Sequence, residues 1–359
     1  MSAPTLRHAI QLLPPCGTTG IGSLPHTQLE LALQMALQVD IPFLPQLPRQ
    51  DPAEFMIPAA LDGLPGLSFD TDGLCTVDLP TWEREKSAYE KKLEGALKSG
   101  ELTAFEPSIS SCRAWRPFLW EAENRKLALC KTQIAGPATV RWVAKTSNGE
   151  PVSEHAELDQ QIFRLLLARC TAMVKALRRV NATPIVFLDE PGLYALDPRN
   201  ARHLIVLQEL KLLIAGLQKE GALVGLHCCS NTEWGHLLDL GLNILSVDAR
   251  LSLDALLEDR KKFLRFLETE ATLSLGIVPT DVASTYRVQE LADSVEASLR
   301  ATLPASRPFS RVLSQVLLTP ACGLAMRSVM DAERIFDEVK EAQGLFRRAL
   351  SEESPRANA

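Results

Sequence analysis

Residues 184–229 read PIVFLDEPGLYALDPRNARHLIVLQELKLLIAGLQKEGALVGLHCC. The segment begins and ends with short apolar runs, and each run stops at a cluster of polar or cysteine residues, which is typical of buried strands. Between them, residues 201–220 carry apolar side chains at spacings of three and four, which indicates a helix with one buried face. A strand, a helix and a second strand in this order predict a βαβ unit with parallel strands.

The same alternation recurs along the chain and predicts eight strands. We expect them at residues 18–23, 41–47, 131–136, 184–189, 223–229, 244–248, 273–278 and 316–319, with helices that include 28–38, 158–179, 201–220, 288–301 and 331–349. Eight strands with intervening helices favour a closed (β/α)8 barrel of the TIM type over an open doubly wound sheet.

The expected domain organisation is an N-terminal segment (1–16), one barrel (17–350) and a polar, flexible tail (351–359). Residues from about 51 to 130 are too many for one crossover, so we expect an insertion after the second strand. Its early part, AALDGLPGLSFDTDGLCTVDLP at 59–80, alternates and turns like a hairpin or a lid over the barrel mouth.

Composition narrows the class of protein. The chain has 359 residues, of which 46% are hydrophobic and 23% charged, and its formal net charge is −6. A chain without a basic surface is not expected to bind nucleic acid. No apolar run is long enough for a membrane span, and Pro14 and Pro15 interrupt the stretch that a signal peptide would need. We therefore expect a cytoplasmic protein whose eight cysteines are reduced.

The strongest chemical signal is GLHCCSN at residues 225–231. Side chains alternate along a strand, so His227 and Cys229 face one way and Cys228 the other. Imidazole and thiolate are good zinc ligands, and barrel active sites lie at the carboxyl ends of the strands. The alternative is a buried histidine beside core cysteines.

Two further residues belong with this pair. Cys322 lies in LLTPACGL (317–324), just after the last expected strand, and therefore at the same end of the sheet. Asp248 ends the intervening strand and has two interpretations. In the first it is a fourth zinc ligand or hydrogen-bonds to one of the ligands. In the second it caps the following helix.

The chain resembles a known family in five motifs. Ile21-Gly22-Ser23, Gly136-Pro137-Ala138-Thr139, Asp189-Glu190-Pro191, His227-x-Cys229 and Pro320-Ala321-Cys322-Gly323-Leu324 are similar, in order, to the catalytic C-terminal barrel of cobalamin-independent methionine synthase. That family belongs to the superfamily that also holds uroporphyrinogen decarboxylase. The resemblance covers about residues 17–342 and implies a (β/α)8 barrel that binds Zn²⁺ through His227, Cys229 and Cys322. Asp248 stands where the family has a glutamate ligand.

The resemblance also implies substrate contacts. Ile21, Gly22 and Ser23 would contact the carboxylate of an amino-acid substrate, and Asp189 would hold its ammonium group. Gln46 stands where the family has a glutamate, which weakens recognition of an amino group. The best-known members carry a second, N-terminal barrel that helps to bind the folate donor, and this chain has one barrel. The resemblance therefore leaves two methyl donors open: a methylfolate, or a methylated corrinoid that is free or on a partner corrinoid protein.

These observations predict a zinc-dependent methyltransferase of the homocysteine S-methyltransferase type, which binds a small thiol as a zinc thiolate and methylates it. Homocysteine, giving methionine, is the first candidate acceptor. Three alternatives stay open: a decarboxylase of the uroporphyrinogen type, a corrinoid-dependent methyltransferase with another thiol acceptor, and a noncatalytic protein that binds zinc or a corrinoid partner.

Overall fold

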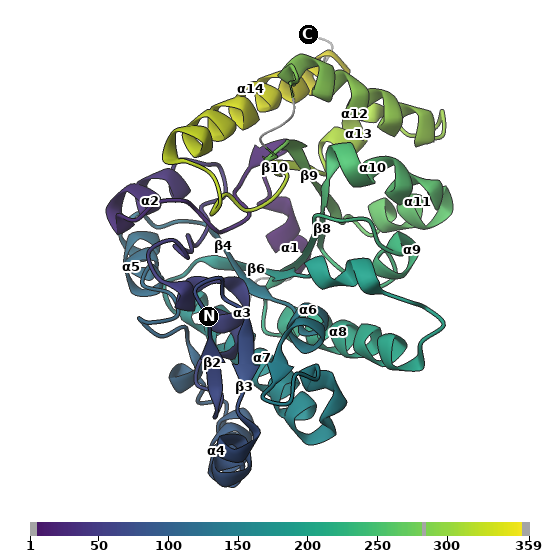
Figure 1. Ribbon diagram of the computed structural model, residues 1–359. Coiled ribbons are helices and arrows are strands. Elements are labelled where there is room, and N and C mark those ends of the chain that lie inside the picture. The colour runs from purple at the N-terminus through teal and green to yellow at the C-terminus, as the bar shows by residue number, and fades with distance from the viewer. Residues whose placement is uncertain (1–5, 282–284, 354–359) are drawn as a thin grey trace.

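The computed structural model describes residues 6–281 and 285–353. Within them, seven strands form one parallel sheet in the order β1-β10-β9-β8-β7-β6-β4. The strands are β1 (Gly17–Thr18), β4 (Leu129–Ala135), β6 (Thr183–Asp189), β7 (Leu223–Cys228), β8 (Ile244–Asp248), β9 (Thr272–Val278) and β10 (Val316–Pro320). The sheet curls around α1 (Leu6–Gln11), with the other helices outside it (Figure 1). The α/β class is confirmed, and seven of the expected strands are present, although the first, expected at 18–23, is a two-residue strand at Gly17–Thr18.

The expected second strand, residues 41–47, is not a regular strand. It makes two isolated parallel bridges, Phe43 with Lys131 and Gln46 with Ser23. Backbone bonds accompany them, from Leu44 N to Lys131 O at 2.8 Å and from Gln46 N to Gly22 O at 3.0 Å. Prolines at 42, 45 and 48 lack an N–H, which prevents a continuous ladder here. Ile41 N also donates to Thr18 O of β1 at 3.0 Å, so the segment lies between the two edge strands, β1 and β4, and contacts both.

The expected helices are all present. They are α2 (Leu29–Ala36), α7 (Ala156–Arg179), α8 (Ala201–Lys219), α12 (Val288–Thr302) and α14 (Val329–Glu353). Shorter elements complete the connections: α6 (Pro137–Val143), η3 (Val152–Glu154), η4 (Pro191–Ala195), α9 (Trp234–Leu237), α10 (Ala249–Glu258), α11 (Arg260–Glu268) and α13 (Phe309–Leu313). The apolar faces of these helices pack against the outer face of the sheet in one large core.

The segment after residue 51 contains the expected hairpin and more. Strands β2 (Leu67–Phe69) and β3 (Cys75–Val77) pair antiparallel, and β3 also pairs with β5 (Lys145–Thr146). The rest of the segment is helical, with η1 (Pro52–Glu54), α3 (Met56–Leu61), α4 (Leu79–Ser99), η2 (Thr103–Phe105) and α5 (Trp115–Asn124). We did not predict these helices, although Asp78 caps α4 and the left-handed Gly100 ends it.

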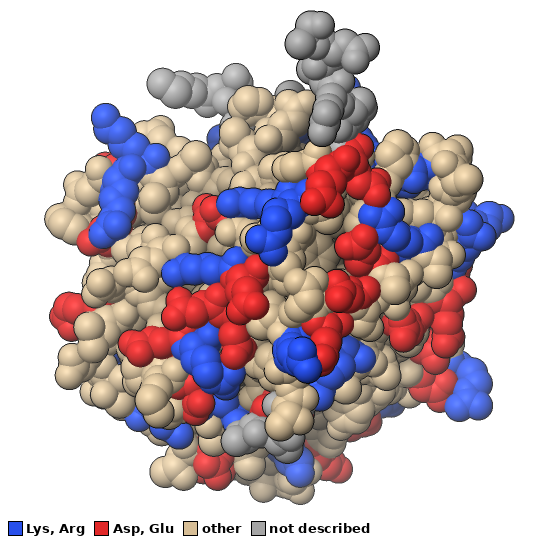
Figure 2. All heavy atoms as spheres, turned by 90° about the horizontal axis from the view of Figure 1, so that it is seen from above, with Lys and Arg blue, Asp and Glu red and all other residues tan. Residues whose placement is uncertain are grey.

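Both termini differ from the simple expectation. Helix α1 is not a separate segment, because it packs on apolar residues of the inner face of the sheet. The tail predicted at 351–359 begins too early, since α14 continues to Glu353; residues 354–359 lie outside the described part. On the face in Figure 2, cationic and anionic side chains are intermingled. No helix in residues 6–281 and 285–353 has the length and apolar character of a membrane span.

Candidate metal centre

Three residues predicted as metal ligands lie together. His227 is in β7, Cys229 directly follows that strand, and Cys322 follows β10. Their ligand atoms all lie within 4.8 Å of one another. Cys228 is fully buried and belongs to the core on the outer face. The convergence of the three side chains and the opposite orientation of Cys228 are confirmed.

The sheet register places polar residues in one row across neighbouring strands. Asp189 of β6 pairs with His227 of β7, which pairs with Ser246 of β8, which pairs with Ser274 of β9. His227 Nδ1 lies 3.0 Å from Ser246 Oγ, while the buried Nε2 has no hydrogen-bond partner among the described residues. Ser246 thus orients the ring and leaves Nε2 available. Sequence analysis missed Ser246, although it precedes Asp248 by two residues on the same strand face.

The two cysteines influence each other's acidity. A hydrogen bond from Cys229, with a further contribution from His227, lowers the pKa of Cys322 to about 4 despite its burial. The same hydrogen bond, together with burial, raises the pKa of Cys229. Cys322 is therefore the more acidic of the two thiols, and the His227 ring lies beside both sulfurs.

The donor set fits zinc. One imidazole nitrogen and two cysteine sulfurs are a typical partial set for Zn²⁺, and a buried nitrogen without a partner is what a missing ligand bond leaves behind. If Nε2 binds the metal, Nδ1 carries the proton and donates a hydrogen bond to Ser246 Oγ, which is how a zinc-bound histidine is usually held in place.

Asp248 lies outside the group of three. Its Oδ1 accepts hydrogen bonds from Arg250 N at 2.9 Å and Leu251 N at 3.0 Å, so it caps α10. Burial raises its pKa, and the negative charge of Cys322 adds to the rise. Asp248 is thus near the centre, in the capping geometry that was one of its two interpretations.

The residues expected to contact the substrate reach the same place. Ser23 bridges to Gln46, and its carbonyl accepts a bond from Leu324 N at 2.9 Å. There is no room for a Cβ at Gly323, because Ser23 Oγ occupies that space. The turn at 21–23 is therefore packed directly against the residue that follows Cys322.

A buried lysine completes this region, and sequence analysis missed it. Lys131 is 1% exposed, and its Nζ donates to Ile21 O at 2.7 Å and Gln133 Oε1 at 3.1 Å. It lies 4.6 Å above the centre of the Phe187 ring. Burial lowers its pKa to about 8, and the charge of Asp189 opposes this. A lysine alternating with Gln133 inside an apolar strand was the available signal.

Asp189 and its neighbour Glu190 have different surroundings. Asp189 is buried, and its Oδ1 has no partner among the described residues. Burial raises its pKa to about 6, while Lys131 and His227 oppose the rise. Glu190 instead accepts bonds from Ala138 N and from Thr139, and so holds the start of α6. Asp189 is therefore the acid of this pair that is available to a ligand.

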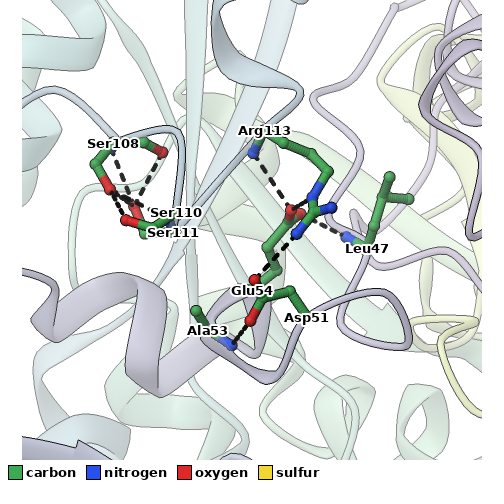
Figure 3. Close-up of polar contacts among 8 residues, drawn as sticks. All are labelled: Leu47, Asp51, Ala53, Glu54, Ser108, Ser110, Ser111 and Arg113. Atoms are coloured by element: carbon green, nitrogen blue, oxygen red, sulfur yellow. Dashed lines mark hydrogen bonds and ion pairs between the residues drawn. The ribbon is translucent and has the colours of Figure 1, made fainter.

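The inserted segment anchors the chain beside Gln46. Buried Glu54 accepts a bond from Leu47 N at 2.8 Å and pairs with Arg113, which also reaches Asp51 (Figure 3). In the turn ahead of Arg113, the hydroxyl of Ser108 hydrogen-bonds to those of Ser110 and Ser111. The backbone that carries Gln46 is thus fixed by an ion pair with a buried carboxylate.

No known family model and no curated protein matches the sequence. Among solved structures, the chain is similar to a D-psicose 3-epimerase determined with D-fructose, with 10% identity, 66% of this chain and 83% of that chain covered, and a TM-score of 0.37. It is also similar to the GH113 beta-mannanase AaManA from Alicyclobacillus acidocaldarius, with 13% identity, coverage of 67% and 93%, and a TM-score of 0.33. Likenesses at this level say nothing about activity or ligands.

Proposed function

We propose that the protein is a zinc-dependent methyltransferase of the cobalamin-independent methionine synthase type, which methylates a small thiol. The observation that carries the proposal is the meeting of His227, Cys229 and Cys322, with ligand atoms within 4.8 Å, at the carboxyl ends of β7 and β10. Homocysteine is the first candidate acceptor. A decarboxylase of the uroporphyrinogen type has no need for this set of ligands.

We further propose that the fold is a closed (β/α)8 barrel with residues 41–47 as its eighth strand. Two contacts of this segment support closure: Ile41 N donates to Thr18 O of β1 at 3.0 Å, and Phe43 forms a bridge with Lys131 of β4. A closed ring would direct the inner side chains at the carboxyl ends of the strands to one mouth, where barrel enzymes bind their substrates.

The described residues offer three ligand atoms that lie together. A catalytic zinc site keeps an exchangeable position, and the Oδ1 of Asp248 is already used by the cap of α10. Bound zinc would supply the Lewis acidity that keeps a thiol deprotonated at neutral pH. In this proposal Ser246 orients His227, and the 21–23 turn and Asp189 would hold the acceptor.

The methyl donor arrives from outside the chain in this proposal, as a methylcorrinoid, free or protein-bound, or as a methylfolate. The residues around the centre would position two substrates and exclude water, which suffices for an in-line displacement at carbon.

The test is a methyl-transfer assay on zinc-loaded full-length protein. Methylcobalamin and methyltetrahydrofolate are offered with homocysteine and other small thiols, and zinc content is measured on the same sample. We expect one zinc per chain and a methylated thiol with one of the donors. A protein that binds zinc but whose Co²⁺-substituted form shows no spectral change with any thiol would be a noncatalytic zinc protein, and the proposal would be wrong.

A further inference from the structure

A buried arginine of α7 has hydrogen-bond donors without acceptors. Arg169 is 4% exposed, and its Nη2 donates to the carbonyl of Asp62, at the end of α3, at 2.5 Å. Its Nε and Nη1 atoms have no hydrogen-bond partner among the described residues. A guanidinium carries one N–H group on Nε and two on each of the other nitrogens. Three of the five N–H groups of Arg169 therefore lack an acceptor.

The positive charge of Arg169 is only partly balanced. Asp62 Oδ2 lies 3.8 Å from Arg169 Nη1, which is beyond hydrogen-bond distance, and the Asp62 side chain is 28% exposed. Burial lowers the pKa of Arg169, while the charge of Asp62 opposes this. An arginine side chain nevertheless stays protonated in proteins, so the cation is not removed by loss of its proton. A buried cation without a close counter-charge is costly, and a bound anion would offset that cost.

Arg169 lines a small cavity between α7 and the inserted segment. Its walls also come from α3, from residues 107–112 and from β4, where Ile134 belongs to the core outside the sheet. Besides Arg169, the polar residues of its described lining are uncharged: Gln46, Ser111 and Gln133. The three candidate metal ligands are not part of this lining, so the cavity is a site separate from the metal centre.

The cavity has room for one small particle. Its volume is about 20 Å³, and a single water molecule needs roughly 10–15 Å³ of such space. A halide ion is only slightly larger than water, whereas sulfate, phosphate and carboxylates have several heavy atoms and are too large. Water accepts hydrogen bonds but leaves the positive charge unbalanced. A halide ion accepts them and balances the charge.

We propose that the Arg169 cavity is a binding site for a small monovalent anion such as chloride, which lies between α7 and the inserted segment. The inference does not depend on the proposed methyl transfer. Because only the folded chain forms the cavity, binding would couple stability to chloride concentration. Above the dissociation constant, each tenfold increase in chloride should raise the equilibrium constant for folding about tenfold.

The experiment measures urea unfolding of the full-length protein in sodium chloride and in sodium gluconate. The two salts are compared at equal ionic strength, so that screening of surface charges is the same, and gluconate is too large for the cavity. Urea is the denaturant because guanidinium chloride would itself supply the ion. We expect the urea midpoint to rise more steeply with chloride than with gluconate, and bromide to act as chloride does.

Two variants remove the site in different ways. Arg169→Met removes the charge and keeps an unbranched side chain, and Ala59→Val keeps the charge but fills part of the cavity, which Ala59 lines. We expect both to lose the difference between chloride and gluconate. Arg164→Met is the matched control, because it makes the same charge change on α7 at a residue outside the cavity lining, and it should keep the difference.

A second measurement locates the ion directly. Crystals of the wild-type protein grown in sodium bromide should show an anomalous peak beside Arg169, and this result decides the matter if Arg169→Met does not fold. A bromide map without that peak would show that the cavity holds water only. A difference between chloride and gluconate that is the same in the wild type and in Ala59→Val would place any chloride effect elsewhere. Either result overturns the inference and leaves the proposed function standing.

Discussion

The inner face of the sheet has two parts with opposite chemistry. Its lower part is apolar, and α1 packs against it; the residues are Ile41, Leu129, Ile185, Phe187, Leu223, Ile244 and Leu317. Its upper part, at the carboxyl ends of the strands, is polar, with Lys131, Gln133, Asp189, His227, Ser246 and Ser274 all buried. Burying polar groups is costly unless they are bonded, and several of these atoms have no partner in the described chain. The lower part therefore stabilises the fold, and the upper part gives up stability to keep groups available for ligands.

The largest effect should come from the upper part. Cys322→Ser replaces a thiolate with a hydroxyl, which is a poor zinc ligand at neutral pH, so we expect zinc content and methyl transfer to be lost together. Metal analysis and the transfer assay measure this. Cys228→Ala is the matched control: its side chain lies on the outer face, and it should keep its zinc. A Cys322→Ser protein that keeps one zinc per chain would show that the ligand assignment is wrong.

The second-largest effect should come from the lower part, where we expect a substitution to lower stability and leave zinc binding unchanged. Leu223→Ala leaves a cavity under α1 and should lower the free energy of unfolding by about 2–5 kcal/mol, with zinc affinity unchanged. Denaturant unfolding measures the loss. Leu212→Ala, on the exposed side of α8, should cost little. If Leu223→Ala released zinc while the protein stayed folded, the two parts would not be independent.

The sequence predicts the sheet better than the site. Strand positions follow from short apolar runs, and seven of eight became regular strands, while the prolines of 41–47 prevented the eighth from pairing continuously. The convergence of His227, Cys229 and Cys322 was predictable because parallel strands end at one edge. The register row that adds Ser246 was not, since it depends on how β7 and β8 align.

Other features depend on contacts that no single segment of sequence contains. The packing of α1 against the lower part needs the sheet to be curled first. Asp248 had two interpretations, and only the position of the backbone N–H groups of Arg250 and Leu251 shows the capping one. Gln133 hydrogen-bonds to both Lys131 and Gln46, and so links residues that are 85 apart in the sequence.

Because Lys131, in the upper part, has a lowered pKa, the stability of the protein should depend on pH. The pKa of Lys131 is lowered from 10.5 to about 8, so between these values the unfolded chain holds a proton that the folded chain has lost. Stability should therefore rise with pH across this window, by about 1–3 kcal/mol. Lys131→Met should remove that rise, and the exposed Lys91→Met should not. Unfolding curves from pH 7 to pH 11 measure the difference, and equal slopes in all three proteins would contradict it.

A smaller effect tests how the upper part orients its ligand. Ser246→Ala removes the partner of His227 Nδ1 and should weaken zinc binding by about 10- to 100-fold, because outer-shell partners of zinc-bound histidines have effects of that size. Ser274→Ala is a close control, since Ser274 is the paired residue on β9 and its hydroxyl has no partner among the described residues. Competition with a chelator gives the affinities. Equal affinities in the two variants would exclude an orienting role for Ser246.

The smallest expected effect tests whether Asp248, which caps α10, also binds the metal. As a helix cap it contributes about 0.5–2 kcal/mol to stability, and Asp248→Ala should lose that amount and keep its zinc. Asp259→Ala removes the corresponding cap from α11 and should cost a similar amount. Unfolding and chelator competition on the same samples separate the two roles. A drop in zinc affinity greater than about tenfold in Asp248→Ala alone would show that its carboxylate also binds the metal, because loss of a cap affects the helix and not the ion.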